Sequence, residues 1–271
     1  MKKNKKRLDV LLVDEGYCSS REKARAAVMA GHVYVDGEKV TKPGQMVAAG
    51  AELEVKGSPC PYVSRGGLKL EKAILSFGID LKDRVVIDVG ASTGGFTDCA
   101  LKFGAKLVYA VDVGYGQLAW SLRRDERVVV LERTNIRYLE SGALAEAPEV
   151  ALIDVSFISL FKVLPKINEL TSARAEIIAL VKPQFEAGRE KVGKKGVVKD
   201  KSVHREILKG ILSFAAGLGW DAAGLDYSPV TGPKGNIEYL AYWKKGPRNE
   251  AAASCPSIYF VVEEAHARLK N

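Results

Sequence analysis

The chain has 271 residues, and 47% of them are hydrophobic, which is typical of one large folded domain or of one large and one small domain. Its net charge of +8 favours a polyanionic partner, and its four cysteines lack the Cys-x-x-Cys spacing of zinc sites and are too isolated for a disulfide framework. We therefore expect reduced thiols in a cytoplasmic protein. No apolar run approaches the roughly 18 residues of a membrane span, and the stretch after the basic N-terminus is too short and too charged for a signal peptide.

Residues 1–57 are predicted to form a small separate unit of two helices and short strands. The leucines from Leu8 to Leu12 share one helical face. Ser19 or Ser20 can cap a second helix, and Gly31 is a suitable stop for it. The expected elements are helices over residues 8–16 and 20–29, a hairpin over 33–40 with the turn Asp36-Gly37, and a last strand at 53–55.

This unit carries eleven Lys/Arg against eight Asp/Glu, a balance that fits either a phosphate-contacting face or a solvated helix with a basic tail. Three of its segments resemble the S4-type RNA-binding domain: Arg7-Leu-Asp-Val-Leu-Leu, Ser20-Arg-Glu-Lys-Ala-Arg and Gly31-His-Val-Tyr-Val-Asp-Gly-Glu-Lys-Val. The resemblance implies an RNA-binding role for Arg7, Ser20, Arg21, Lys23 and Arg25.

Prolines in Ser58-Pro-Cys-Pro predict a linker over residues 58–64, and a regular alternation of strands and helices follows over 65–245. The expected strands are Val85–Val89, Leu107–Val113, Val128–Leu131, Val150–Val155 and Ile177–Val181, with a helix at Val203–Leu218 and a final hairpin of Leu225–Val230 and Ile237–Trp243. Unbroken apolar strands of this kind are typical of a doubly wound, Rossmann-like α/β sheet. Residues 246–271 are expected to form a tail with a short helix at Val262–Lys270.

A glycine-rich turn follows the first of these strands, in Asp88-Val-Gly-Ala-Ser-Thr-Gly-Gly-Phe. Its spacing differs from Gly-x-Gly-x-x-Gly, so it favours S-adenosylmethionine over a dinucleotide. A carboxylate at the end of the second strand, Asp112, fits a ribose hydroxyl, a nicotinamide cofactor or a simple strand-end cap. The predicted cofactor-binding residues are Asp88, Gly90, Ala91, Ser92, Thr93, Gly94, Gly95, Phe96, Asp112, Val113, Asn135 and Asp154.

Two lysines and two carboxylates lie where the predicted elements approach this cleft: Lys69, Asp154, Lys182 and Glu238. Each alone is an ordinary polar residue at a loop or strand end. Together they suit the methylation of a ribose 2′-hydroxyl, which is a poor nucleophile and needs a base to accept its proton. A lysine serves as that base once burial or a neighbouring cation favours its neutral form.

These four residues resemble the Lys-Asp-Lys-Glu tetrad of FtsJ-type ribose 2′-O-methyltransferases. With the N-terminal unit, and with the motifs Tyr62-Val-Ser-Arg-Gly-Gly-Leu-Lys-Leu, Ile153-Asp-Val-Ser-Phe-Ile-Ser and Lys182-Pro-Gln-Phe-Glu, the chain resembles the hemolysin A (TlyA) family of ribosomal RNA methyltransferases. The resemblance implies that Lys182 is the base and that Lys69, Asp154 and Glu238 support it. It also implies cytidine targets in ribosomal RNA of one or both subunits; no metal or obligate protein partner is expected.

A basic loop over residues 186–199 follows Lys182 and carries Arg189 among four lysines. It either clamps RNA phosphates or is simply solvated, and Arg65 is a further RNA-binding candidate. Other classes fit less well. A secreted cytolysin needs export and membrane insertion, and a non-catalytic RNA-binding regulator has no need of an intact tetrad. A pseudouridine synthase with an S4-type domain lacks the glycine-rich loop, and the loop spacing disfavours a nicotinamide-dependent oxidoreductase.

Overall fold

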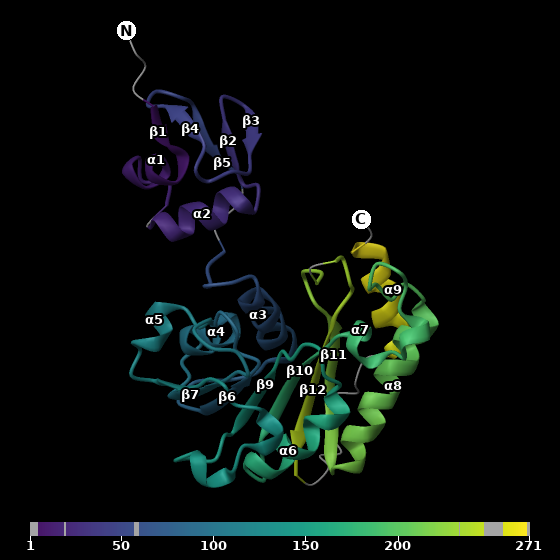
Figure 1. Ribbon diagram of the computed structural model, residues 1–271. Helices are drawn as coiled ribbons and strands as arrows, with labels where there is room; N and C mark the ends of the chain where they lie inside the picture. Colours follow the sequence, from purple (N-terminus) through teal and green to yellow (C-terminus); the bar gives the residue numbers. More distant parts are fainter. Residues whose placement is uncertain (1–4, 19, 57–59, 233, 247–256, 270–271) are drawn as a thin grey trace. The chain divides into compact units, whose positions relative to one another are not determined.

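The structure, a computed structural model, describes residues 5–18, 20–56, 60–232, 234–246 and 257–269 (Figure 1). The chain divides into two compact units, Met1–Pro61 and Tyr62–Asn271. Our sequence-based boundaries, with a linker at 58–64 and a tail at 246–271, stay a proposal. Residues 58–59 of that linker, and residues 247–256 and 270–271 of that tail, lie outside the described residues. Cys255, one of the expected thiols, also lies outside them, whereas Cys18, Cys60 and Cys99 form no disulfide within the described residues.

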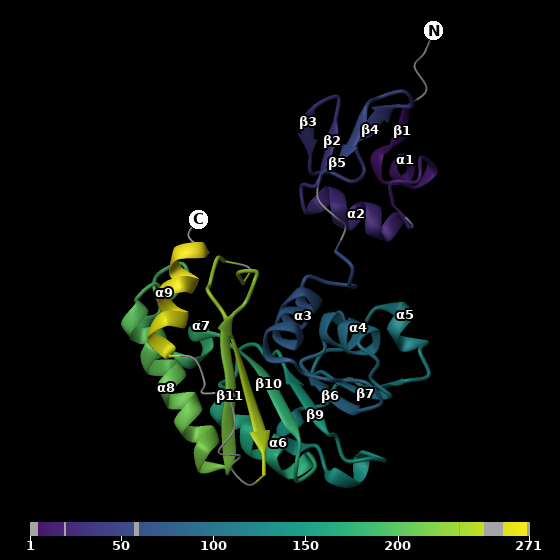
Figure 2. The ribbon, with the colours of Figure 1, turned by 180° about the vertical axis from the view of Figure 1, so that it is seen from behind.

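The N-terminal unit packs two helices on small sheets, as Figure 2 shows from behind. Its elements are β1 (Lys5–Arg7), α1 (Leu8–Asp14), α2 (Arg21–Met29), β2 (Val33–Val35), β3 (Glu38–Val40), β4 (Met46–Ala48) and β5 (Leu53–Val55). The sheet order β3-β2-β5 contains the expected hairpin, and Leu8, Leu12, Val28 and Val33 are fully buried in the core. The antiparallel pair β1–β4 was not expected, because β1 is the wholly polar segment Lys5-Lys6-Arg7 and has no alternation of apolar residues.

The second unit is built on a seven-stranded sheet of order β11-β12-β10-β9-β6-β7-β8. Its strands are β6 (Val85–Val89), β7 (Leu107–Val111), β8 (Val128–Leu131), β9 (Val150–Ile153), β10 (Glu176–Val181), β11 (Trp220–Tyr227) and β12 (Tyr239–Lys245). Strands β6 to β10 pair in parallel, whereas β12 runs antiparallel to both β10 and β11. This arrangement confirms the predicted Rossmann-like sheet with its antiparallel final strand.

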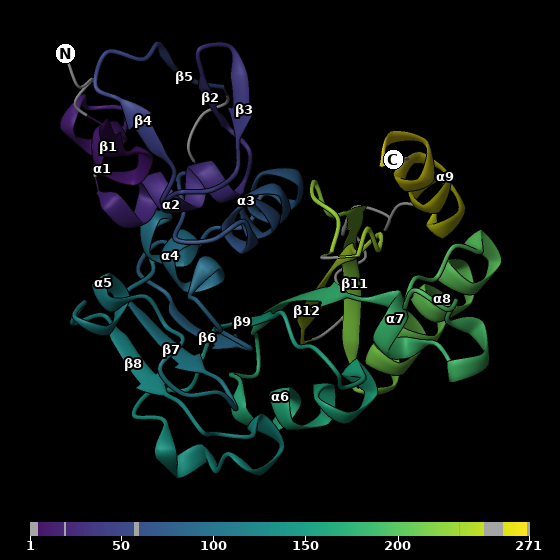
Figure 3. The same cartoon turned by 45° about the horizontal axis from the view of Figure 1, so that its top comes forward.

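Helices cover both faces of this sheet, as Figure 3 shows. They are α3 (Gly66–Phe77), α4 (Gly95–Lys102), α5 (Trp120–Arg123), α6 (Leu164–Leu170), α7 (Pro183–Glu186), α8 (Lys201–Gly217) and α9 (Ile258–Arg268). Side chains of α6, α8 and α9 share one hydrophobic cluster with the sheet, and α3 packs against α4. The helix that we expected at Val262–Lys270 is α9, which begins four residues earlier, at Ile258. Its Val262 is fully buried in that cluster.

Several strands end earlier or lie elsewhere than the sequence indicated, and the differences concern the site. Strand β7 ends at Val111 and β9 at Ile153, so that Asp112 and Asp154 lie in the loops that follow. Glu238 was expected to interrupt a strand, but it directly precedes β12. The backbone still pairs there, because Ser228 N–H donates to the Glu238 carbonyl at 2.8 Å. These side chains consequently project from loops at one edge of the sheet.

Candidate active site

The sheet order brings distant parts of the chain to one edge. The carboxyl ends of the neighbouring parallel strands β6, β9 and β10 lead into the glycine-rich turn, Asp154 and Lys182 respectively. Strand β12 runs antiparallel beside β10, so its first residues, next to Glu238, meet the same edge. Open α/β sheets bind ligands outside the carboxyl ends of their strands, and the four predicted tetrad residues are gathered there.

The Asp154 carboxylate lies between the two lysines. Lys182 Nζ is 2.6 Å from Asp154 Oδ1, and Lys69 Nζ is 4.0 Å from Asp154 Oδ2. Lys69 Nζ also donates to Glu238 Oε2 at 2.7 Å, so the four side chains form one continuous chain of ion pairs. The two ammonium groups balance the two carboxylates in charge.

Burial makes this balance important, since an unpaired charge in a dry site is strongly disfavoured. Lys182 is 8% exposed and Glu238 only 1%.

Two residues that the sequence did not single out complete the polar contacts of the tetrad. Lys182 Nζ donates a hydrogen bond to Ser156 Oγ at 2.9 Å, and Gln184 Nε2 donates to Glu238 Oε1 at 3.5 Å. Ser156 was visible in the motif that follows Asp154, but nothing in its spacing marked it as a partner of Lys182.

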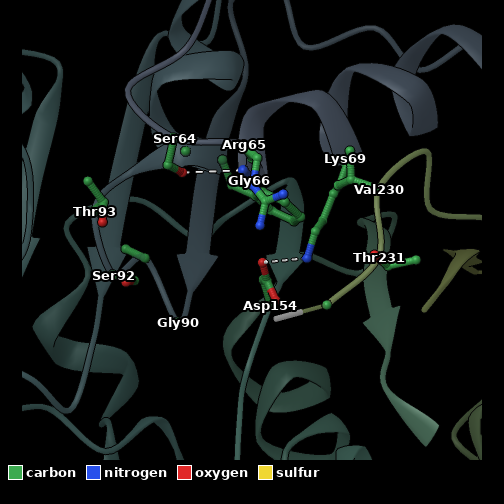
Figure 4. A pocket seen from close by; sticks show the side chains of 14 residues that line it. Ser64, Arg65, Gly66, Lys69, Gly90, Ser92, Thr93, Asp154, Val230 and Thr231 are labelled. Atoms are coloured by element: carbon green, nitrogen blue, oxygen red, sulfur yellow. Dashed lines mark hydrogen bonds and ion pairs between the residues drawn. The ribbon is translucent and has the colours of Figure 1, made fainter. Parts of the chain in front are cut away.

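A cavity of about 330 Å³ adjoins the tetrad (Figure 4), within the range of roughly 300–1,000 Å³ that is usual for small-molecule sites. Figure 4 shows Lys69 pointing across it toward Asp154. Seven of the predicted cofactor-binding residues line it: Gly90, Ala91, Ser92, Thr93, Gly95, Phe96 and Asp154. The other lining residues, which include the predicted RNA-binding residue Arg65, are Ser64, Arg65, Gly66, Lys69, Val230, Thr231 and Gly232.

Gly90 and Gly95, which line this cavity, have no room for a side chain. A Cβ atom on Gly90, whose φ is +89°, would lie 2.6 Å from the Asp154 carbonyl oxygen. One on Gly95 would lie 2.3 Å from Ser64 Oγ and 2.9 Å from the Gly67 nitrogen. Glycine at these two positions therefore lets the segments that carry Asp154, Ser64 and Gly67 pack directly against the glycine-rich turn.

The remaining predicted cofactor residues do not line this cavity. Asp112 accepts hydrogen bonds from the Ser92 and Gly114 nitrogens and thereby fixes the loop, and Val113 beside it is 71% exposed. Asn135 caps a short 3₁₀ helix, where its Oδ1 accepts from the backbone nitrogen of Arg137. Gly94 faces the side chains of Leu118 and Leu122 instead.

Asp88 lies below the glycine-rich turn and is fully buried. Its Oδ2 accepts from Thr97 Oγ1 at 2.6 Å, whereas its Oδ1 has no hydrogen-bond partner among the described residues. Burial, with a smaller effect from the charge of Asp154, raises the pKa of Asp88 to about 7. Asp88 thus supports the turn from behind, and its side chain does not reach the cavity.

A second cavity of about 520 Å³ combines cations with aromatic rings. Arg137 and Lys162 line it together with Phe157 and Phe185, whose ring centroids are 4.9 Å apart. Phe157 is 90% exposed and has a φ of +63°, a conformation that is costly for a bulky residue and is often retained for function. Lys182 Nζ lies 5.9 Å from the centre of the Phe185 ring, so this cavity is close to the tetrad.

The other predicted RNA-binding residues are distributed over both units. In the N-terminal unit, Arg7 and Arg21 both contact Asp9, Lys23 and Arg25 are exposed on α2, and Ser20 Oγ caps α2 by accepting from the Lys23 nitrogen. In the second unit, Arg189 is exposed on a short 3₁₀ helix of the basic loop.

The basic loop is attached at its far end. Asn236, which is 4% exposed, donates to the Gly196 carbonyl at 2.9 Å and accepts from the Val198 nitrogen at 3.2 Å. His204 Nε2 lies 3.0 Å from the Val198 carbonyl, and burial lowers the pKa of His204 to about 4. His204 is therefore a neutral structural residue, and the loop is held close to the segment that carries Glu238.

No group of three or more His, Cys, Asp or Glu side chains in the described ranges is arranged to hold a metal ion. Within those ranges, too, no helix is long and apolar enough to span a membrane.

Comparisons with known proteins agree with this site. A family model described as FtsJ-like methyltransferase matches residues 62–245, and one described as S4 domain matches residues 6–53. The chain is 54% identical over 274 residues to "Putative rRNA methyltransferase YqxC" of Bacillus subtilis, covering 100% of this chain and 98% of the relative. It is 45% identical to the 16S/23S rRNA (cytidine-2′-O)-methyltransferase TlyA of Mycobacterium tuberculosis, covering 96% of each.

A solved structure, "Putative hemolysin from Streptococcus thermophilus", has 47% sequence identity and a TM-score of 0.76, and the match covers 98% of this chain and 97% of that one. The matches confirm a methyltransferase that uses S-adenosylmethionine and an RNA-binding domain of the S4 type. They also favour this class over a pseudouridine synthase or an oxidoreductase. The chain therefore belongs to the hemolysin A (TlyA) family of FtsJ-like methyltransferases and carries an S4 domain ahead of its methyltransferase unit.

Proposed function

We propose that this protein methylates the ribose 2′-hydroxyl of a cytidine in ribosomal RNA of the small subunit, the large subunit or both, and that it acts in the cytoplasm. The observation that carries the proposal is the Asp154 carboxylate held between Lys182, at 2.6 Å, and Lys69, at 4.0 Å. The M. tuberculosis relative, which aligns with nearly the whole chain, is a 16S/23S rRNA (cytidine-2′-O)-methyltransferase, and this supports cytidine and ribosomal RNA as the target.

Lys182 is the residue best suited to accept the hydroxyl proton. Its Nζ is held by Asp154 and Ser156, so the amine has a fixed position and a partner that stabilises it after protonation. Lys69 adds a positive charge on the other side of Asp154, and Glu238 prevents that charge from being left unpaired. Bound S-adenosylmethionine supplies an activated methyl group. The neutral Lys182 amine would accept the hydroxyl proton while the ribose oxygen takes the methyl group; the methyl–sulfur bond breaks, S-adenosylhomocysteine leaves, and Lys182 returns the proton to solvent.

The glycine-lined cavity supports the assignment of S-adenosylmethionine as the cofactor. The second cavity has the side chains expected of a surface that binds RNA next to the tetrad. Exposed aromatic rings bind nucleobases by stacking, and arginine and lysine bind phosphates. Phe157 and Phe185 offer the rings, and Arg137 and Lys162 offer the charges. The two polar partners of Lys182 connect the cavities: Asp154 lines the first cavity, and Ser156 directly precedes Phe157, which lines the second. A ribose that enters from the second cavity therefore comes close to the proposed base.

The test is methyl transfer from labelled S-adenosylmethionine to purified small and large ribosomal subunits that lack the modification, followed by mapping of the labelled nucleotide. We expect label on a 2′-oxygen of cytidine in at least one subunit, and none with the Lys182→Ala protein. Label on a base nitrogen or carbon, or equal label with Lys182→Ala, would refute the proposed chemistry. Testing the two subunits separately decides the target range.

A further inference from the structure

Asp9 is an acidic residue buried inside the basic N-terminal unit. Its side chain has 0% exposure, although it lies in the first turn of α1 beside two arginines. It accepts hydrogen bonds from Arg7 Nε and Arg7 Nη2, both at 2.9 Å, and from Arg21 Nε at 3.1 Å. One carboxylate therefore binds two guanidinium groups from different elements.

The surrounding backbone fixes this cluster. The Asp9 backbone nitrogen donates to the Pro43 carbonyl at 3.0 Å, so the start of α1 is tied to the turn before β4. Gly44 in that turn lies against the Arg7 guanidinium, since a Cβ atom on Gly44 would be 3.3 Å from Arg7 Nη2. Ser20 caps α2 immediately before Arg21. The cluster is thus assembled from three separate segments of the unit.

The arginines keep most of their donors available. A guanidinium has five N–H groups; Arg7 gives two of them to Asp9, and Arg21 gives one. The other N–H groups have no protein acceptor within the part of the chain that the structure describes. The side chain of Arg7 is 46% exposed and that of Arg21 is 57% exposed. Hydrogen bonding to Arg7 lowers the pKa of Asp9 to about 2, so its charge persists at neutral pH.

We propose that Asp9 is a positioning residue that holds Arg7 and Arg21 side by side as a clamp for one RNA phosphate. The inference rests on the proposed RNA-binding function of this unit. Two guanidinium groups at such close range repel each other, and a carboxylate between them offsets that repulsion. Held in place, they lose less side-chain entropy on binding, and their free N–H groups suit the oxygens of a phosphate.

The clamp and a simple dependence on net charge predict opposite effects of Asp9→Asn on RNA affinity. If total charge alone determined RNA affinity, removing a negative charge from this surface would strengthen binding. The clamp requires the opposite result for Asp9→Asn. A matched control lies on the same helix, because Asp14→Asn makes the same charge change at a residue that is half-exposed and that, among the described residues, pairs only with Lys6.

The experiment measures binding of the full chain to a fluorescein-labelled RNA hairpin by anisotropy across a range of salt concentrations. We expect Asp9→Asn to weaken binding by about tenfold, the value of one charge-assisted hydrogen bond, and to flatten the salt dependence. Asp14→Asn should bind equally well or more tightly. The double variant Asp9→Asn/Arg21→Ala should be little weaker than Arg21→Ala alone, because both changes disable the same clamp.

Thermal unfolding separates positioning from loss of fold, and Arg7→Lys provides a second route if Asp9→Asn unfolds the unit. Arg7→Lys keeps the charge but loses the fork, so it should also weaken binding. The clamp would be overturned if folded Asp9→Asn, or Arg7→Lys, kept wild-type RNA affinity and salt dependence while Arg21→Ala weakened binding. RNA binding by this face would still stand in that case. If Arg7→Ala and Arg21→Ala both bind the hairpin like wild type, the proposed RNA role of this face fails instead.

Discussion

Lys182 Nζ lies 2.6 Å from Asp154 Oδ1, and it reaches this position from the strand adjacent to the one that precedes Asp154. The distance is that of an ion pair, so Asp154 holds the lysine side chain in one place. The proposed reaction uses the neutral amine, because only that form can accept a proton from a ribose hydroxyl. Lys182 is therefore both the ion-pair partner of Asp154 and the proposed base.

The first prediction tests that dual role with Lys182→Arg. Arginine keeps the positive charge beside Asp154 but cannot deprotonate at neutral pH. We expect single-turnover methyl transfer to fall by ~10²-fold or more. Cofactor affinity should be retained, because Lys182 does not line the glycine-rich cavity. Near-normal turnover of the variant would show that Lys182 acts only as an electrostatic clamp.

The second prediction concerns the cofactor cavity and uses Gly95→Ala. The new Cβ would lie 2.9 Å from the backbone nitrogen of Gly67, so the start of α3 must move, and with it Lys69. We expect calorimetry to show S-adenosylmethionine binding weakened by about tenfold or more, equivalent to ~1.4 kcal/mol. Gly142→Ala is the control, since a Cβ there meets nothing within 4 Å. Equal affinity of both variants would place the cofactor elsewhere.

The sequence predicted the sheet well because its buried parallel strands are continuous apolar runs. The positions of Asp154 and Lys182 followed from the same reasoning, since each lies at the end of such a run, whereas Glu238 was expected within a strand and directly precedes β12. The sequence could not predict which polar side chains contact the tetrad. Ser156 and Gln184 become partners of the tetrad only through the crossover from β9 to β10 and the antiparallel pairing of β12.

Local composition also could not distinguish a ligand-facing residue from one behind the turn. Asp88 and Gly94 belong to the same glycine-rich segment as Gly90, yet Asp88 is fully buried and Gly94 faces α5. The strands β1 and β4 were missed for a different reason. Strand β1 is the polar segment Lys5-Lys6-Arg7, and its pairing with β4 joins distant segments, so no alternation of apolar residues marked the pair.

The third prediction concerns the attachment of the basic loop by Asn236. Asn236→Ala leaves the Gly196 carbonyl and the Val198 nitrogen without their side-chain partner, at a cost of about 1–3 kcal/mol. We expect faster trypsin cleavage after Lys194 and Lys195, because the loop opens more often. Asn168→Ala removes a hydrogen bond to Trp220 Nε1 elsewhere in the unit and should leave these cleavage rates unchanged. Equal rates in all three proteins would show that Asn236 does not restrain the loop.

The last prediction concerns the buried carboxyl of Asp88, whose pKa rises from 3.8 to about 7 on folding. Below about pH 4 the group is protonated in both states and has no effect on the pH dependence of stability. Between about pH 4 and pH 7 the unfolded chain releases the proton first, so folding loses stability as pH rises; above pH 7 the loss is constant. The variant Asp88→Asn cannot ionise, and it keeps an oxygen that accepts the hydrogen bond from Thr97. We therefore expect urea unfolding of the second unit to show a smaller loss of stability between about pH 4.5 and pH 7.5 than in wild type, by a difference on the order of 1–3 kcal/mol.

Thr97→Val is the complementary control, because it removes the hydrogen bond that favours the ionised form of Asp88 and should move the wild-type loss of stability to higher pH. Parallel pH profiles for wild type and Asp88→Asn would mean that Asp88 is ionised in the folded protein throughout this range.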